Sequence, residues 1–181
     1  MNVATGLDFA IQEDQQDPLR HFRNRFVIED SELIYLDGNS LGRLPKATVE
    51  LAHQVIEQQW GHGLIRSWQE RWLDLPVKLG RKIAQLIGAS PEEVLVADST
   101  SVNLFKLALA TMQAIPERNT IITDDLNFPS DIYVLQSTTN LVGNDSHLEI
   151  LQSSDGASVL LSQLDQTIAG DTALVSLCHT A

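Results

Sequence analysis

The apolar residues of this chain follow two alternating patterns. Short continuous apolar runs bounded by Gly, Asp, Asn or Ser predict buried strands at residues 94–97, 119–123, 147–151 and 172–178. Elsewhere apolar residues recur every three or four positions, which predicts helices. The predicted helices begin at Asp17-Pro18 and cover residues 45–60, 72–87, 102–109, 130–141 and 157–168. Strands that alternate with helices indicate βαβ units, so the predicted fold class is α/β, with a mainly parallel sheet flanked by helices.

Segment 94–109 contains the first candidate for ligand binding. Its predicted strand is followed by a turn of four small polar residues, Asp98 to Ser101, and the predicted helix begins directly after this turn. The first N–H groups of a helix lack partners within the helix and lie at the positive end of its dipole, so phosphate binds readily there. The hydroxyl groups of the turn would add donors. The alternative is an ordinary helix cap, in which Ser or Thr satisfies the same N–H groups and nothing binds.

A second polar turn, residues 124–131, follows the next predicted strand. Ligands of open parallel sheets bind at the carboxyl ends of the strands, and both polar turns occupy that position. Because the two strands are consecutive, we expect turns 98–101 and 124–131 to lie near each other on one edge of the sheet.

Composition places the chain among globular proteins and narrows its partners. Of its 181 residues, 43% are hydrophobic and 20% are charged, and the net charge is −12. This charge argues against a nucleic-acid partner, which needs a basic face, but not against a small phosphorylated cofactor. Cys178 is the single cysteine, which excludes an internal disulfide and favours a reducing compartment such as the cytoplasm. The N-terminal residues lack a signal-peptide pattern and no apolar run has the length of a membrane span, so we expect no membrane partner.

The chain ends at Ala181, directly after the last predicted strand. Domains seldom end at the exit of a strand, and a parallel strand needs cover on both faces. We therefore expect this chain to be the N-terminal portion of a longer protein. The alternative is a complete small α/β domain with an ordinary C-terminal strand.

Four motifs then stand out in the order of the chain. They are Ile34-Tyr-Leu-Asp-Gly-Asn-Ser-Leu-Gly-Arg-Leu-Pro-Lys-Ala-Thr48, Trp60-Gly-His-Gly-Leu-Ile-Arg-Ser-Trp68, Asp98-Ser-Thr-Ser-Val-Asn-Leu104 and Asn127-Phe-Pro-Ser-Asp-Ile-Tyr133. Together they resemble the motifs of kynureninases, which belong to the aminotransferase-like, fold-type I enzymes that use pyridoxal 5′-phosphate. Asn-Ser-Leu-Gly alone is a weak signal, but combined with Phe-Pro-Ser-Asp the set is fairly specific. The resemblance implies the large domain of a fold-type I enzyme.

The resemblance also implies roles for single residues. The residues implied to bind the cofactor are Thr100 and Ser101 at its phosphate, Phe128 stacked on its pyridine ring, and Pro129, Ser130 and Asp131 in the same turn. Those implied to lie near the substrate pocket are Ser40 and His62.

Several of these residues also have a purely structural explanation. Taken by itself, Phe128 is better explained as a turn residue packed into the core, and Asp131 is explained equally well as a carboxylate favoured at a helix N-terminus. Ser40 suits a turn held by side-chain to backbone bonds. His62, between two glycines, suits a surface loop.

The covalent part of such an active site is not recognisable in this sequence. Pyridoxal chemistry needs a lysine that forms a Schiff base with the cofactor. The four lysines of the chain are Lys46, Lys78, Lys82 and Lys106. None lies in surroundings that resemble the family's lysine. We therefore assign no catalytic residue and no metal site here, and we expect the Schiff-base lysine after Ala181.

For the whole protein the resemblance implies hydrolysis of L-kynurenine or 3-hydroxykynurenine to anthranilate or 3-hydroxyanthranilate and L-alanine, in tryptophan catabolism and NAD biosynthesis. It also implies a cytoplasmic homodimer with a small-molecule substrate. The predicted domains are an N-terminal helical arm with the entrance segment (1–45) and an incomplete cofactor-binding domain (46–181). Two alternatives stay open: another fold-type I enzyme, such as a cysteine desulfurase-like lyase, and a catalytically inactive fragment.

Overall fold

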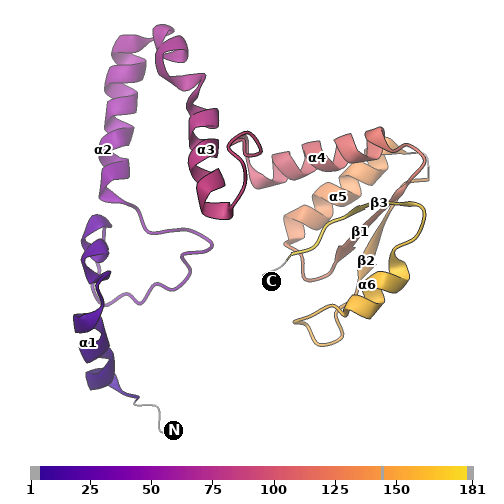
Figure 1. Cartoon of the computed structure of the whole chain (residues 1–181), viewed down its shortest axis with the longest axis horizontal. Coiled ribbons are helices and arrows are strands. Elements are labelled where there is room, and N and C mark those ends of the chain that lie inside the picture. Colours follow the sequence, from indigo (N-terminus) through magenta and orange to yellow (C-terminus); the bar gives the residue numbers. More distant parts are fainter. Residues whose placement is uncertain (1–4, 144, 179–181) are drawn as a thin grey trace. The chain divides into compact units, whose positions relative to one another are not determined.

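The computed structural model describes residues 5–143 and 145–178, which fall into two compact units (Figure 1). Unit 1 spans Met1–Lys78 and unit 2 spans Leu79–Ala181. The division falls within helix α3 (Leu75–Ile87). The functional boundary expected at residue 45 stays a prediction. In the described part of the chain, no helix is both long enough and apolar enough to cross a membrane.

Unit 1 consists of helices joined by extended segments. Helix α1 (Leu7–Gln16) precedes a 3₁₀ helix at Arg20–Arg25. Helix α2 (Lys46–Gln54) continues directly into a π-helix at Val55–Gly63, and a second π-helix follows at Trp68–Trp72. Between the first helices and α2 the chain is irregular and includes a turn at residues 38–40.

Two sequence predictions for unit 1 are wrong in detail. The α-helix expected from Asp17-Pro18 forms only as the short 3₁₀ helix, and none of its residues is buried, so no packed apolar face supports a longer helix. The break expected at 61–63 does not occur, because the π-helix continues through Gly63. The helix ends instead at Leu64, whose φ of 50° places it in the left-handed region.

Unit 2 is built on a three-stranded parallel sheet with the strand order β2-β1-β3. Its strands are β1 (Thr120–Asp124), β2 (His147–Leu151) and β3 (Thr172–Val175). Every residue of the central strand β1 is buried, as a strand covered on both faces requires. The α/β class with a parallel sheet is therefore confirmed.

Helices cover both faces of this sheet. Helices α4 (Thr100–Ala114) and α5 (Pro129–Val142) pack on one face, and α6 (Leu161–Thr167) lies on the other (Figure 1). The reason is the handedness of the connections: β2 and β3 flank β1 on opposite sides, so two right-handed crossovers place their helices on opposite faces. The core between α4, α5 and β1 is formed by Ala108, Met112, Ile121 and Leu135.

The predicted strands 119–123, 147–151 and 172–178 are confirmed as β1, β2 and β3, although β3 ends at Val175. The strand predicted at 94–97 is wrong: these residues are irregular and pair with no other strand of the described chain. The helix predicted at 157–168 begins only at Leu161. Its first residues instead belong to a loop in which the Asp155 carboxylate accepts hydrogen bonds from the N–H groups of Ala157 (2.9 Å) and Ser158 (2.8 Å).

Candidate functional site

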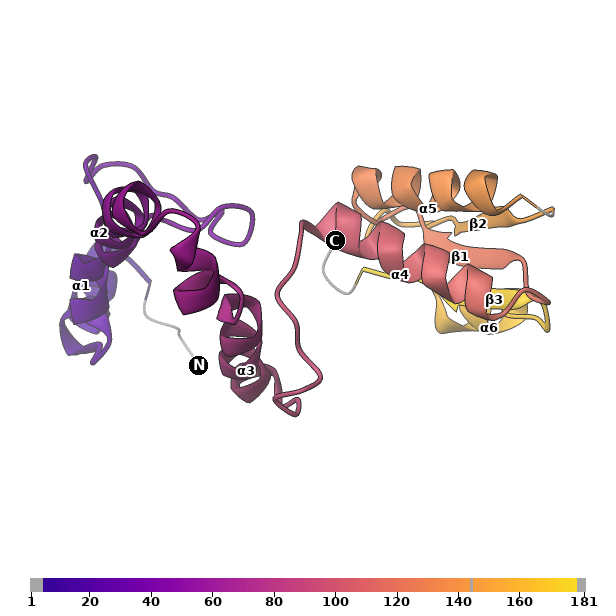
Figure 2. The same ribbon diagram turned by 90° about the horizontal axis from the view of Figure 1, so that it is seen from above.

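Helices α4 and α5 begin side by side at one end of unit 2. They run in the same direction over the sheet, as the two views in Figures 1 and 2 agree. A groove of about 320 Å³ lies between their N-terminal halves and is lined by Ser101, Val102, Phe105, Tyr133, Val134 and Ser137. Of the residues predicted to bind the cofactor, Ser101 lines this groove, whereas Thr100 and Phe128 do not. Because α5 follows the carboxyl end of β1, the first turn of α5 lies at the edge of the sheet where ligands of parallel sheets bind.

The first turn of α4 presents hydrogen-bond donors that meet no acceptor among the described residues. Ser99 is the N-cap, and its Oγ accepts a long hydrogen bond of 3.4 Å from the N–H of Val102. Within the described chain, no acceptor meets the N–H or hydroxyl groups of Thr100 and Ser101. Thr100 is exposed and Ser101 is half-buried. These donors, at the positive end of the α4 dipole, suit an anion such as phosphate.

Two side chains of α4 reach back to hold the preceding turn. Asn103 donates from Nδ2 to the carbonyl of Ala97 at 2.8 Å, and Lys106 forms an ion pair with the Asp98 carboxylate. Asp98 has a φ of 34°, a conformation that residues other than glycine rarely adopt. Lys106 thus stabilises a strained turn beside the donors. Sequence reasoning missed this role: it excluded Lys106 as the Schiff-base lysine and assigned it no other function.

The turn before α5 exposes an aromatic ring. Phe128 is the N-cap of α5, Pro129 is its first residue, and the Phe128 side chain is 69% exposed. Phe128 is therefore not a core residue, which removes the structural explanation considered for it. The half-buried Asp131 accepts a hydrogen bond of 3.2 Å from the Ser130 hydroxyl. An exposed aromatic face at this position is available to stack on a flat ring.

Asn127, directly before Phe128, was given no role by sequence reasoning. Its side chain is only 8% exposed, and it bonds to Thr123 of β1, to Ser176 beyond β3 and to the N–H of Phe128. The four-residue spacing of Thr123 and Asn127 is visible in the sequence. Their common partner Ser176 is not, because it lies 49 residues further along the chain.

The two residues expected near a substrate both belong to unit 1. Ser40 is exposed in a turn where its N–H donates to the carbonyl of Asp37 at 3.2 Å. His62 is exposed near the end of the π-helix, where its Nδ1 lies 3.0 Å from Oε1 of Gln58. His62 is therefore a helical residue and not the loop residue considered from its flanking glycines.

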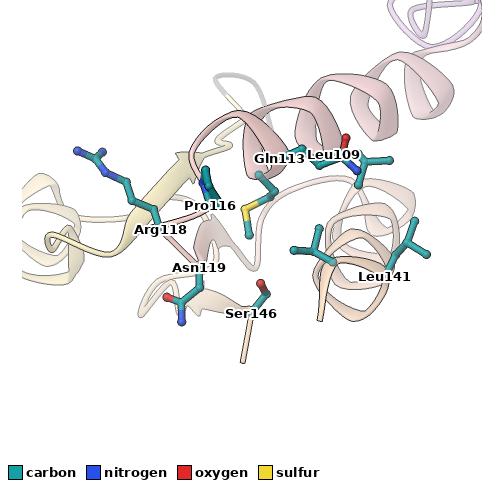
Figure 3. Close-up of a pocket in the computed structure, with 9 residues that line it drawn as sticks. Leu109, Gln113, Pro116, Arg118, Asn119, Leu141 and Ser146 are labelled. Carbon is teal, nitrogen blue, oxygen red and sulfur yellow. The ribbon is translucent and has the colours of Figure 1, made fainter. Parts of the chain in front are cut away.

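A cavity of about 540 Å³ lies elsewhere in unit 2 (Figure 3). It is formed at the C-terminal ends of α4 and α5 and at the start of β1, by residues that include Leu109, Met112, Asn119 and Leu141. Figure 3 shows the Arg118 guanidinium directed away from the apolar side chains. None of the predicted site residues lines this cavity, so it is distinct from the candidate site.

The described residues contain no cluster of three or more His, Cys, Asp or Glu side chains that could hold a metal ion. The clearest pKa shift lies outside the site. Hydrogen bonds from the N–H of Ala157 and from Ser158 and Ser153 hold the pKa of Asp155 well below its usual value. The candidate site therefore consists of the N–H and hydroxyl donors of Thr100 and Ser101, which suit a phosphate, and of the aromatic face of Phe128.

Comparison with known proteins identifies a family and several similar sequences. The sequence pattern described as "Aminotransferase class-V" matches residues 34–181. A kynureninase from Pseudomonas fluorescens is 41% identical over 171 residues, which are 92% of this chain and 39% of that protein. A kynureninase from Geobacillus thermodenitrificans (strain NG80-2) is 42% identical over 176 residues, and one from Burkholderia mallei (strain SAVP1) is 37% identical over 175 residues. Each alignment covers 94% of this chain and 41% or 40% of the relative, so the chain spans about two fifths of the length of these relatives.

Proposed function

The chain belongs to the aminotransferase class-V family, and from this premise we propose that the protein is a pyridoxal 5′-phosphate-dependent enzyme. The observation that carries the proposal is the juxtaposition of two helix N-termini. One offers the unpartnered donors of Thr100 and Ser101, and the other offers the exposed ring of Phe128. A phosphorylated aromatic cofactor needs both kinds of group.

We assign each turn one part of the cofactor. The N–H and hydroxyl groups of Thr100 and Ser101 hold the phosphate, whose charge is favoured by the α4 dipole. The Phe128 ring covers one face of the pyridine ring, while Pro129, Ser130 and Asp131 shape the rest of the turn. When bound, pyridoxal 5′-phosphate supplies an electron sink for carbanion chemistry. These residues bind and orient the cofactor, and none is assigned a proton transfer.

For the reaction, we propose hydrolysis of L-kynurenine by one water to anthranilate and L-alanine, with 3-hydroxykynurenine as a related substrate. The support is an identity of 37–42% to kynureninases over 92–94% of this chain. Ser40 and His62 are proposed to lie near the substrate. We place the reaction in tryptophan catabolism and NAD biosynthesis in the cytoplasm.

We further propose that the protein acts as a homodimer and that unit 1 contributes to the contact. Among the described residues of unit 1, only Ser67 is buried. Large apolar side chains remain exposed instead, among them Trp60 (65%), Ile65 (77%) and Trp68 (50%), which line a hollow of about 240 Å³. Apolar patches of this kind are typical of protein–protein contacts.

The test is an assay of the protein that the gene encodes. We expect it to release fluorescent anthranilate from L-kynurenine, and we expect a Thr100→Ala/Ser101→Ala variant to need more pyridoxal 5′-phosphate for the same rate. L-cysteine is the control substrate for a desulfurase-like lyase. Release of sulfide from L-cysteine without release of anthranilate from L-kynurenine would contradict the proposed reaction.

A further inference from the structure

We propose that Asn127 is a positioning residue, which fixes Phe128 against the cofactor ring by joining it to the ends of strands β1 and β3. The inference rests on the proposed function, since it assumes that Phe128 stacks on the pyridine ring. It concerns a different residue, however, and makes a prediction for the protein without cofactor.

The hydrogen bonds of Asn127 use its whole amide group. Nδ2 donates to Oγ1 of Thr123 at 3.0 Å and to the carbonyl oxygen of Ser176 at 3.3 Å. Oδ1 accepts from the N–H of Phe128 at 3.0 Å. Thr123 closes the triangle by donating from Oγ1 to the same Ser176 carbonyl at 2.8 Å.

This arrangement requires an amide at position 127. A carboxylate could accept from the N–H of Phe128 but could not donate to the Ser176 carbonyl, and it would place two acceptors against each other. An apolar side chain would leave the Phe128 N–H and the Ser176 carbonyl short of a partner in a poorly hydrated place. The amide of Asn127 therefore bonds to all three neighbouring groups: the hydroxyl of Thr123, the carbonyl of Ser176 and the N–H of Phe128.

The triangle also connects the turn to the buried central strand of unit 2. Thr123 is fully buried in the central strand, and Asn127 is 8% exposed. Ser176 is joined to β1 by its own N–H, which donates to the carbonyl of Ile122 at 2.9 Å. The ring of Phe128 is 69% exposed and gains little support from packing. The position of Phe128 therefore depends on its backbone, which the hydrogen bond from its N–H to Asn127 restrains.

The first arm of the experiment needs no cofactor. In the apo form of the full protein, we expect Asn127→Ala to raise the hydrogen–deuterium exchange of peptides that cover residues 124–132 by about tenfold, because the Phe128 N–H loses its acceptor. That factor corresponds to about 1.4 kcal/mol. The matched control is Asn119→Ala, which removes an amide from the opposite end of β1, where Nδ2 donates to the carbonyl of Asp145 at 3.4 Å. We expect the control to leave exchange at 124–132 unchanged.

The second arm measures cofactor geometry. We expect Asn127→Ala to weaken binding of pyridoxal 5′-phosphate about tenfold in equilibrium dialysis. At saturating cofactor it should still reduce the circular dichroism of the bound cofactor, because the ring is no longer held at one angle. A merely destabilised protein would regain the wild-type signal at saturation. Thr123→Val keeps the shape of the side chain and the hydrogen bond between Asn127 and Ser176. We expect this variant to bind pyridoxal 5′-phosphate about threefold more weakly than the wild type.

Phe128→Ala separates the two proposals. If it weakens cofactor binding while Asn127→Ala and Thr123→Val bind as the wild type does, Asn127 is not a positioning residue and the proposed function stands. If Phe128→Ala has no effect on cofactor binding, the assignment of the cofactor ring to Phe128 fails. Should Asn127→Ala not fold, Asn127→Asp takes its place. The aspartate keeps an acceptor for the Phe128 N–H but loses both donations to Thr123 and Ser176, which join the turn to the strands. Faster exchange at 124–132 then supports the proposal, and unchanged exchange overturns it.

Discussion

At the scale of single residues, the candidate site separates side chains proposed to meet the cofactor from side chains that hold the turns. Thr100 and Phe128 are exposed, whereas Thr123 and Asn127 are buried and fully bonded. Short sequence motifs single out the first kind, whose role in cofactor binding stays a prediction. The second kind could not, because the role of Asn127 depends on Ser176, a distant residue that only the sheet brings near.

Phe128→Ala should weaken cofactor binding without destabilising the protein. Contacts of an aromatic pair are worth about 0.5–1.5 kcal/mol beyond the area they bury, which corresponds to about a twofold to tenfold loss of affinity. Stability should not change, since the side chain is 69% exposed. Phe128→Tyr should bind as the wild type does, and Leu161→Ala, at a 78% exposed position on α6, serves as the unrelated control. Affinity and the urea midpoint are the two measurements.

Asp155 should remain ionised at a pH where an ordinary aspartate is half protonated. Its pKa is lowered from 3.8, first by the N–H of Ala157 and then by Ser158 and Ser153. The folded state holds the charged form of Asp155 more firmly than the unfolded state does. The contribution of this charge to the free energy of unfolding is therefore complete above pH 3.8 and is lost as the pH falls through the lowered pKa. The pKa of Asp155 is measured from the ¹³C shift of its carboxyl group, followed from pH 6 downward. A midpoint at or above 3.8 would contradict the bonding seen in this loop.

At the scale of elements, the sequence predicted those whose pattern is supported by packing. Residues 147–151 and 130–141 carry apolar side chains that enter the core of unit 2, and β2 and α5 form there. The prediction failed where an apolar run lacks a partner: residues 94–97 form no strand, and no strand of the described chain pairs with them. A helical arm was expected within residues 1–45, but α1 was not predicted as a separate helix, and none of its residues is buried.

Gly80 of α3 offers a test of how one element positions another. A Cβ at Gly80 would lie 2.1 Å from the carbonyl oxygen of Val94, in the segment that leads to the turn 98–101. Alanine favours a helix over glycine by about 1 kcal/mol, but a forced shift of packed backbone costs about 1–3 kcal/mol. We therefore expect Gly80→Ala to lower the free energy of unfolding by about 1 kcal/mol and to weaken cofactor binding. Urea denaturation and dialysis measure the two effects.

Gly170→Ala is the control for this substitution. Its Cβ would meet nothing within 4 Å, and its φ lies outside the left-handed region. We expect no loss of stability there. Equal effects at the two positions would show that the contact between α3 and Val94 does not restrain the chain.

At the scale of the whole molecule, the two units differ in how they bury apolar residues. Unit 2 has a core around Met112 and Ile121, whereas Ser67 is the single buried residue in the described part of unit 1. The sequence could not predict how exposed Trp60 and Trp68 are, because exposure depends on every neighbouring element.

If unit 1 faces a second copy, a charge in its aromatic hollow should weaken self-association. Ile65 is 77% exposed in that hollow, so Ile65→Asp should leave the fold of the monomer intact while it raises the dimer dissociation constant by at least tenfold. Sedimentation equilibrium of the full protein measures it. Leu86→Asp, at an 86% exposed position of α3 in unit 2, is the matched control. A wild-type protein that sediments as a monomer would refute the dimer.

The order of the strands has a consequence for biosynthesis. The central strand meets its first neighbour after a short stretch of chain and its second only when residues 172–175 have left the ribosome. Ser176 follows directly after them, so the turn that carries Phe128 gains this bond only once the third strand has been made. A nascent chain would thus be unable to fix this turn until its third strand has docked beside the central one.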